Sequence, residues 1–166
     1  MKNKSMKKMA LAVGIALMCV AAFCVEKTTT VPITGGFGIT LGAKFTPQLA
    51  KQLKAERAKY DDDTVGYTVV PPKPFKGFTR YSVLLTKDRK IYKIQATCIS
   101  SDTDGPFSDA VYLFQKKYGM VSGIRNELLF IDRKNPTRSV KITKSQFIAA
   151  IVYSDSAVSA ADVDDI

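Results

Sequence analysis

Two runs of residues, Thr79–Lys87 and Lys90–Cys98, alternate between apolar and polar side chains and are separated only by Asp88 and Arg89. Successive side chains of a strand point to opposite faces, so this alternation predicts two strands of an antiparallel sheet with one buried and one solvated face. The apolar positions are Tyr81, Val83, Leu85, Tyr92, Ile94, Ala96 and Cys98. The pattern therefore predicts a β-hairpin with its turn at Asp88-Arg89.

Further strands are predicted where β-branched and aromatic residues gather between turn residues. The last of them, Gln146–Ser154, is apolar at both alternating sets of positions, which is typical of a central or covered strand. The remaining expected strands are Gly36–Leu41, Gly66–Val70, Glu127–Asp132 and Arg138–Thr143.

Two helices are predicted from apolar residues at three- and four-residue spacing. The first runs from Thr46 to Tyr60, with Thr46 as N-cap and Pro47 at the first helical position. The second opens at Pro106, and Gly119 stands where a left-handed C-cap is expected. Its apolar stripe consists of Phe107, Ala110, Val111, Phe114 and Tyr118.

This order of elements predicts an α+β fold, an antiparallel sheet of about five to seven strands with two helices packed on one face. A chain of 166 residues is the length of one domain. We expect that domain at residues 35–154, after an extended lead-in at 25–34 and before a flexible acidic tail at 155–166.

The first residues have the pattern of a secretory signal peptide, which we assign to residues 1–24. Four lysines precede residue 9, and Met9–Val25 carries no charge. The pattern predicts a periplasmic or secreted protein. Two alternatives stay open: an uncleaved membrane anchor through residues 9–25, and lipidation at Cys19 or Cys24.

The chain is basic, with 25 Lys and Arg residues against 15 Asp and Glu. Four of the basic residues lie in the signal segment, so the rest of the chain has a smaller positive excess. Such an excess suits an anionic envelope polymer or lipid headgroups, although a solvated basic surface is the favoured explanation. Nucleic acid is a poor candidate partner for an exported protein.

The residues needed for common catalytic chemistry are missing. The chain has no histidine, the commonest general base and transition-metal ligand. Only Cys98 lies beyond the signal segment, on the apolar face of its strand, where a buried small hydrophobe is expected. We therefore predict a non-enzymatic protein with no cofactor and no metal. An envelope hydrolase that uses a serine and a lysine is the alternative.

Three other motifs have simple structural explanations. Gly35-Gly36-Phe37-Gly38 lacks the Lys-Ser/Thr of a phosphate loop, so its glycines are expected in a strand or bulge. Asp102–Gly105 and Asp109 are expected in a turn and helix cap, with a cation site as the alternative, and Asp61–Asp63 in a solvated turn. Pro71-x-x-Pro74 is expected to be a rigid connector.

Several short sequence motifs together carry a resemblance to known proteins. They are GGFGITLG, the Y-x-V-x-P of Tyr67–Pro71, the F-x-x-Y-x-V of Phe78–Val83, the K-I-Y-K-I-x-A of Lys90–Ala96 and the K-K-Y-G of Lys116–Gly119. The region from Gly35 to Tyr153 resembles small exported bacterial proteins of unassigned function. More loosely, its layout is similar to envelope-assembly lipoproteins and β-lactamase-inhibitor proteins, whose G-M-T-x-x-x-V phrase is absent here. The resemblance implies a sheet that presents a binding face.

The candidate site follows from the polar positions of the central hairpin. They are expected on its outer face, where they would bind a protein or an envelope component; a structural envelope protein without a specific ligand is a further alternative. These positions are Arg80, Ser82, Thr86, Lys93, Gln95 and Thr97.

Overall fold

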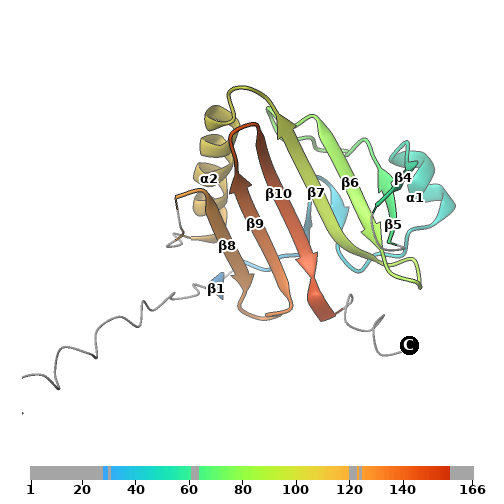
Figure 1. Ribbon diagram of the computed structural model, residues 1–166. Helices are drawn as coiled ribbons and strands as arrows, with labels where there is room; N and C mark the ends of the chain where they lie inside the picture. Colours follow the sequence, from blue (N-terminus) through green and yellow to red (C-terminus); the bar gives the residue numbers. More distant parts are fainter. Residues whose placement is uncertain (1–27, 30, 61–63, 120–122, 124, 158–166) are drawn as a thin grey trace, which may run out of the picture.

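An eight-stranded sheet dominates the computed structural model, which describes residues 28–29, 31–60, 64–119, 123 and 125–157 (Figure 1). Its strand order is β1-β8-β9-β10-β7-β6-β5-β4, and every neighbouring pair except β1–β8 is antiparallel. The strands are β1 (Thr28–Thr29), β4 (Glu56–Lys59), β5 (Val65–Thr68), β6 (Arg80–Leu85), β7 (Ile91–Ile99), β8 (Glu127–Asp132), β9 (Arg138–Lys144) and β10 (Ile148–Asp155). The predicted α+β class with a mostly antiparallel sheet is confirmed.

The core lies on one face of this sheet, where alternate residues of each strand are buried. Ile94, Ile142 and Ile151, from three neighbouring strands, are completely buried. Cys98 belongs to the same cluster, as its position in the alternating pattern predicted. The apolar strand β10 is central, between β9 and β7, which is also as predicted.

Helix α2 (Asp104–Tyr118) covers the core face next to β9 and β10 (Figure 1). Its buried residues are Phe107, Ala110, Phe114 and Tyr118, four of the five positions of the predicted stripe. Gly119 ends the helix with a positive φ of 93°, and its N–H donates to the carbonyl of Gln115. The helix begins two residues before the expected Pro106.

The first helix is much shorter than predicted. Helix α1 spans only Pro47–Gln52, with Thr46 as its N-cap. Lys54 then adopts a left-handed conformation, φ +47°, and the N–H of Ala55 donates to the carbonyl of Ala50. This pair of features is a Schellman ending, so the expected helix over Thr46–Tyr60 is wrong in its second half, which contains β4.

The glycine-rich segment forms a separate small hairpin rather than one strand. Strands β2 (Gly35–Gly36) and β3 (Ile39–Thr40) pair with each other across Phe37 and Gly38. Both turn residues have positive φ, 58° and 81°, which is the geometry of a type I′ turn. The expected single strand Gly36–Leu41 is therefore corrected, and the structural role of its glycines is confirmed.

The ends of the domain extend beyond the expected limits of 35 and 154. In the lead-in, β1 pairs with β8, and the side chain of Ile33 is completely buried. Asp155, expected in the flexible tail, ends β10, is buried and accepts a hydrogen bond from Nε of Arg138 at 2.8 Å. The signal segment 1–24, the turn residues Asp61–Asp63 and most of the tail lie outside the described residues. Within the described part, neither helix has the length and apolar character needed to cross a membrane.

Candidate functional site

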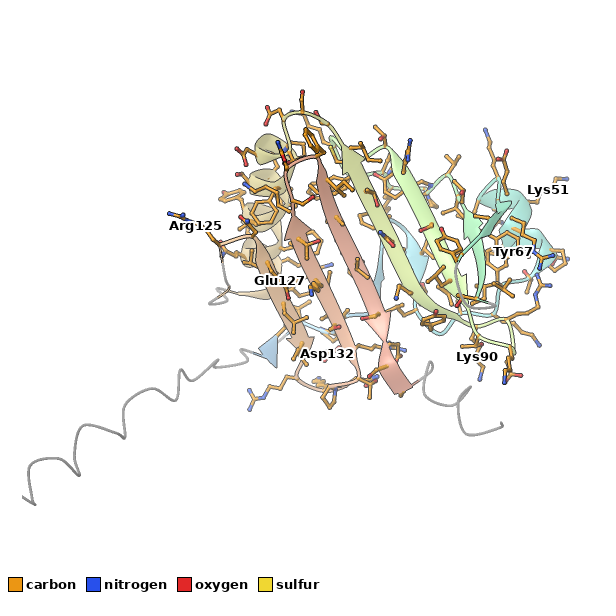
Figure 2. All side chains as sticks on the ribbon, viewed as in Figure 1. Lys51, Tyr67, Lys90, Arg125, Glu127 and Asp132 are labelled. Carbon is orange, nitrogen blue, oxygen red and sulfur yellow. The ribbon has the colours of Figure 1, made fainter. Side chains whose placement is uncertain are left out.

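The second face of the large sheet is not covered by either described helix. Helix α2 and the partly buried Leu49 and Ala50 of α1 pack against the opposite, core face. Figure 2 looks onto the strands of the sheet with their side chains drawn. We call the uncovered face the open face; its described residues are the outward positions of strands β4 to β10.

Cross-strand pairing places the predicted polar residues in rows on the open face. Ser82 lies opposite Gln95 on one side and Thr68 on the other. Arg80 lies opposite Thr97, in the neighbouring row. Because directly opposed side chains in an antiparallel pair are close neighbours, the rows bring guanidinium, amide and hydroxyl groups together.

Four of the six predicted site residues line one hollow of about 430 Å³. Its lining residues are Tyr60, Thr68, Arg80, Tyr81, Ser82, Gln95, Thr97 and Ile99. Within it, Nε2 of Gln95 donates to Oγ1 of Thr97 at 3.3 Å. Arg80 is exposed and forms no ion pair within the part of the chain that the structure describes. The hollow therefore offers hydrogen-bonding groups and one free positive charge beside an aromatic ring and an isoleucine.

Lys93 lies on the open face but outside this hollow. It stands opposite Leu84 on β6 and Ser154 on β10, and its Nζ lies 5.8 Å from the centre of the Tyr92 ring. Lys93 therefore places a second positive charge on the open face, in the row next to that of Ser82 and Gln95.

Thr86 is not a surface residue, and the prediction for it is wrong. Its side chain is buried, and its Oγ1 accepts a hydrogen bond from the N–H of Lys90 at 3.0 Å. The hairpin turn comprises residues 87–89, with Arg89 at φ +60°, so it is one residue longer than Asp88-Arg89. Thr86 consequently closes the turn and takes no part in the open face.

Sequence reasoning missed four contributors to the hollow: Tyr60, Thr68, Tyr81 and Ile99. Tyr60 was expected to end the first helix, whereas its ring lies over Gly66, at which a Cβ would be 2.2 Å from the Tyr60 ring. The alternation of Tyr67 with Thr68 was the signal that could have placed Thr68 outward.

Exposed apolar side chains flank the polar rows. Ile99 and Ile148 lie opposite each other at one end of β7 and β10, and are 49% and 44% exposed. Leu129, on β8, is 36% exposed and lies in the same cross-strand row as Lys141. Lys141 pairs with Glu127 at 2.7 Å, so this acid is neutralised on the surface itself. The open face thus combines apolar contact area with an excess of positive charge.

A different hollow, of about 270 Å³, gathers the residue types of the hydrolase alternative. It includes Ser101, Ser145, Lys144, Asp102 and Asp104. The ammonium of Lys144 forms an ion pair with the Asp104 carboxylate, and Oγ of Ser145 donates to the carbonyl of Ile148 at 3.3 Å. Lys144 is therefore paired with an acid and has no hydrogen bond to a serine within the described residues, contrary to the contact that a serine–lysine nucleophile requires.

The acidic residues near α2 match the predicted turn only in part. Oδ1 of Asp102 accepts the N–H of Asp104 at 3.1 Å, Asp104 pairs with Lys144, and the N-cap Thr103 makes no side-chain capping hydrogen bond. Among the described residues, no group of three or more acidic, cysteine or histidine side chains is arranged to hold a metal ion.

Comparisons with protein-family models, curated proteins and solved structures find no match for this chain. The resemblance to small exported bacterial proteins accordingly stays a hypothesis, and functional arguments rest on the geometry of the chain itself.

Proposed function

We propose that this chain is an exported, non-enzymatic binding domain whose open face docks onto a protein or an anionic envelope polymer. The observation that carries the proposal is the uncovered face of the large sheet, where Arg80 and Lys93 stand among exposed apolar residues. The signal-type pattern of residues 1–24 supports export to the periplasm or the medium, with anchoring through residues 9–25 as the alternative.

The composition of the open face suits recognition of a macromolecule better than catalysis. Among the described residues, the lining of its hollow contains Ser82 but neither a lysine nor a carboxylate that could activate it. Flanking apolar side chains such as Ile99 and Ile148 supply contact area, and basic residues steer an anionic partner toward it. A surface that mixes polar, basic and exposed apolar side chains is typical of a protein-binding face.

Charge reversal on the open face should abolish most partner capture. We expect the double variant Arg80→Glu/Lys93→Glu to recover at least tenfold less partner than the parent, because two attractive charges become repulsive. The measurement is in-cell crosslinking of the full-length, C-terminally tagged chain, followed by affinity purification and quantitative mass spectrometry.

The matched control is Lys51→Glu/Lys116→Glu, which changes the net charge equally at exposed helix positions away from the open face. Its capture of the partner should equal that of the parent. Undiminished capture by the Arg80→Glu/Lys93→Glu variant would refute docking through this face. Recovery of the tagged chain alone, at both low and high salt, would refute the binding function.

A further inference from the structure

Another hollow, of about 620 Å³, lies on the core side of the sheet and is separate from the open face. It is bounded by the β2–β3 hairpin, the last turns of α2 and residues 73–75. Phe114 and Tyr153, both buried, contribute to its lining together with Ile39. Its lining is mixed, polar and apolar, and its volume lies within the range of sites for small organic molecules.

Two charged side chains line this hollow within the part of the chain that the structure describes, and both are lysines. Lys73 comes from the proline-rich connector and Lys117 from α2, and both are exposed. Neither forms an ion pair with any residue that the structure describes. Nζ of Lys117 lies 4.7 Å from the centre of the Tyr118 ring, a cation–π contact that holds the ammonium group close to the helix. The entrance therefore attracts an anionic group.

The walls of the hollow are fixed by hydrogen bonds. The N–H of Lys73 donates to the carbonyl of Phe37 at 3.0 Å and ties the connector to the hairpin. The hydroxyl of Tyr81 accepts the N–H of Phe75 at 2.8 Å, and it lies 3.0 Å from the carbonyl of Phe78, to which it donates. A ligand would thus meet a preformed site and lose little affinity to ordering of the protein.

The apolar surface continues along α2 into an adjoining hollow of about 370 Å³. Phe75 and Leu113 line both the larger hollow and this adjoining one, and Tyr112 lines the adjoining hollow. Leu113 is 46% exposed and Tyr112 is 66% exposed, although both sit on a helix whose other face is buried. The two hollows together form a groove with apolar side chains along α2. Its lysine pair, Lys73 and Lys117, lines the larger hollow, and Lys76 and Asp109 line the adjoining one.

The phenol group of Tyr153 adds a polar atom to the lining of the larger hollow. Burial raises the pKa of Tyr153, and the neighbouring Tyr118 raises it further, so the Tyr153 hydroxyl stays protonated and can donate a hydrogen bond.

We propose that this groove binds a single-chain fatty acid or a similar acyl anion. The anionic head lies between Lys73 and Lys117, and the acyl chain follows Phe75 and Leu113 toward Tyr112. Charge complementarity at the lysine pair is joined to apolar contacts with Phe75, Leu113 and Tyr112, and a short polar anion or an uncharged lipid would use only one of the two.

The test is calorimetric titration of the purified full-length chain with dodecanoate and with dodecyltrimethylammonium, each below its micellar concentration. Dodecanoate should bind with at least tenfold higher affinity, since the two probes share the chain and differ in head charge. Lys73→Gln/Lys117→Gln should weaken dodecanoate binding roughly tenfold. Leu113→Gln, which removes only apolar contact, should weaken it several-fold.

The control Lys51→Gln/Lys134→Gln removes two exposed lysines outside the groove and should bind dodecanoate like the parent. The apolar segment Met9–Val25 is common to all variants, so differences among them report on the groove. Arg80→Glu/Lys93→Glu should also retain dodecanoate binding, which separates this site from the open face.

Equal affinity for the two probes, or equal affinity of the parent and the Lys73→Gln/Lys117→Gln variant for dodecanoate, would overturn the proposal. Hexaglutamate serves as a further probe. If this peptide binds and dodecanoate does not, the lysine pair belongs to an acidic protein partner and the acyl-anion site is refuted.

Discussion

Replacing Asp132 with asparagine should lower the free energy of unfolding by about 2–4 kcal/mol at neutral pH. Both carboxylate oxygens of this buried residue accept backbone hydrogen bonds: Oδ2 from Ile33 at 2.6 Å, and Oδ1 from Lys134 at 2.8 Å and Asn135 at 3.2 Å. An amide has one acceptor oxygen, so its NH₂ group would face an N–H donor on one side.

The effect is large because Asp132 joins two distant parts of the chain. Asp132 ends β8 next to β1 (Figure 2). Its hydrogen bond from the N–H of Ile33 fixes the lead-in, and the side chain of Ile33 is completely buried. On the other side it shapes the turn from β8 into β9 through Lys134 and Asn135. Loss of the carboxylate therefore loosens an edge of the sheet and the turn together.

The same contacts predict a pH dependence. Burial acts to raise the pKa of Asp132, but three donated hydrogen bonds and nearby Arg138 outweigh it, and the pKa lies below the ordinary value of 3.8. A carboxyl whose pKa is lower in the folded state contributes stability that is complete above its unfolded pKa and is lost as the pH falls through the folded value. The stability curves of parent and variant should therefore converge below pH 3.8.

Urea denaturation of the parent and of Asp132→Asn between pH 2.5 and pH 7 would measure both effects. Asp109→Asn removes one exposed carboxylate from α2 and should change the unfolding free energy by no more than about 0.5 kcal/mol. A constant difference between parent and Asp132→Asn across this pH range would contradict the proposed role of the ionised carboxylate.

Strong local patterns predicted most of the sheet and helix α2. The hairpin β6–β7, the strands β8 to β10 and the C-cap at Gly119 each combine periodicity with a turn or capping residue, so the local signals agree with the final packing. The seven antiparallel strands of the large sheet fall within the expected five to seven, although their membership differs, because β4 belongs to it and Gly36–Leu41 does not.

The ending of α1 was not predictable from the same signals. Left-handed C′ residues are usually glycine, and here the position is occupied by Lys54. The apolar residues Leu53 and Tyr60 happen to keep a helical spacing across that point, but they occupy opposite faces of the sheet: Leu53 is in the core and Tyr60 lines the open face. Tertiary pairing of β4 with β5 overrode the periodic pattern.

The candidate site was predictable only as far as strand alternation extends. Alternation placed Arg80, Ser82, Gln95 and Thr97 on one surface, and pairing of the strands then gathered them in one hollow. The predicted outward position of Thr86 was wrong because the β6–β7 turn is one residue longer than expected. The groove beside Lys73 and Lys117 could not be anticipated, since it depends on how a hairpin, a connector and a helix from distant parts of the chain meet.

Gly36→Ala should destabilise the protein by about 3 kcal/mol, the upper end of the range for overpacked cores. A Cβ at Gly36 would lie 2.1 Å from Cε2 and 2.5 Å from Cζ of Tyr153. That ring cannot move aside easily, because it is buried and packs against Phe37 and Phe114 at centroid distances of 5.5 and 6.0 Å. The steric conflict must therefore displace the β2–β3 hairpin.

The matched control is Gly105→Ala in the first turn of α2, where a new Cβ would meet nothing within 4 Å. Alanine is the better helix former, so this variant should gain up to about 1 kcal/mol. Urea midpoints of the two variants should consequently shift in opposite directions.

A double-mutant cycle identifies the Tyr153 ring as the cause. Tyr153→Leu will itself be destabilising, but on that background Gly36→Ala should cost at least 1 kcal/mol less than in the parent, because the atoms that the Cβ meets have been removed. Equal costs in the two backgrounds would contradict this contact as the source of strain. Strong coupling would mean that Gly36 is required for the approach of the hairpin to Tyr153. Gly36 and Tyr153 both line the groove proposed for the acyl anion.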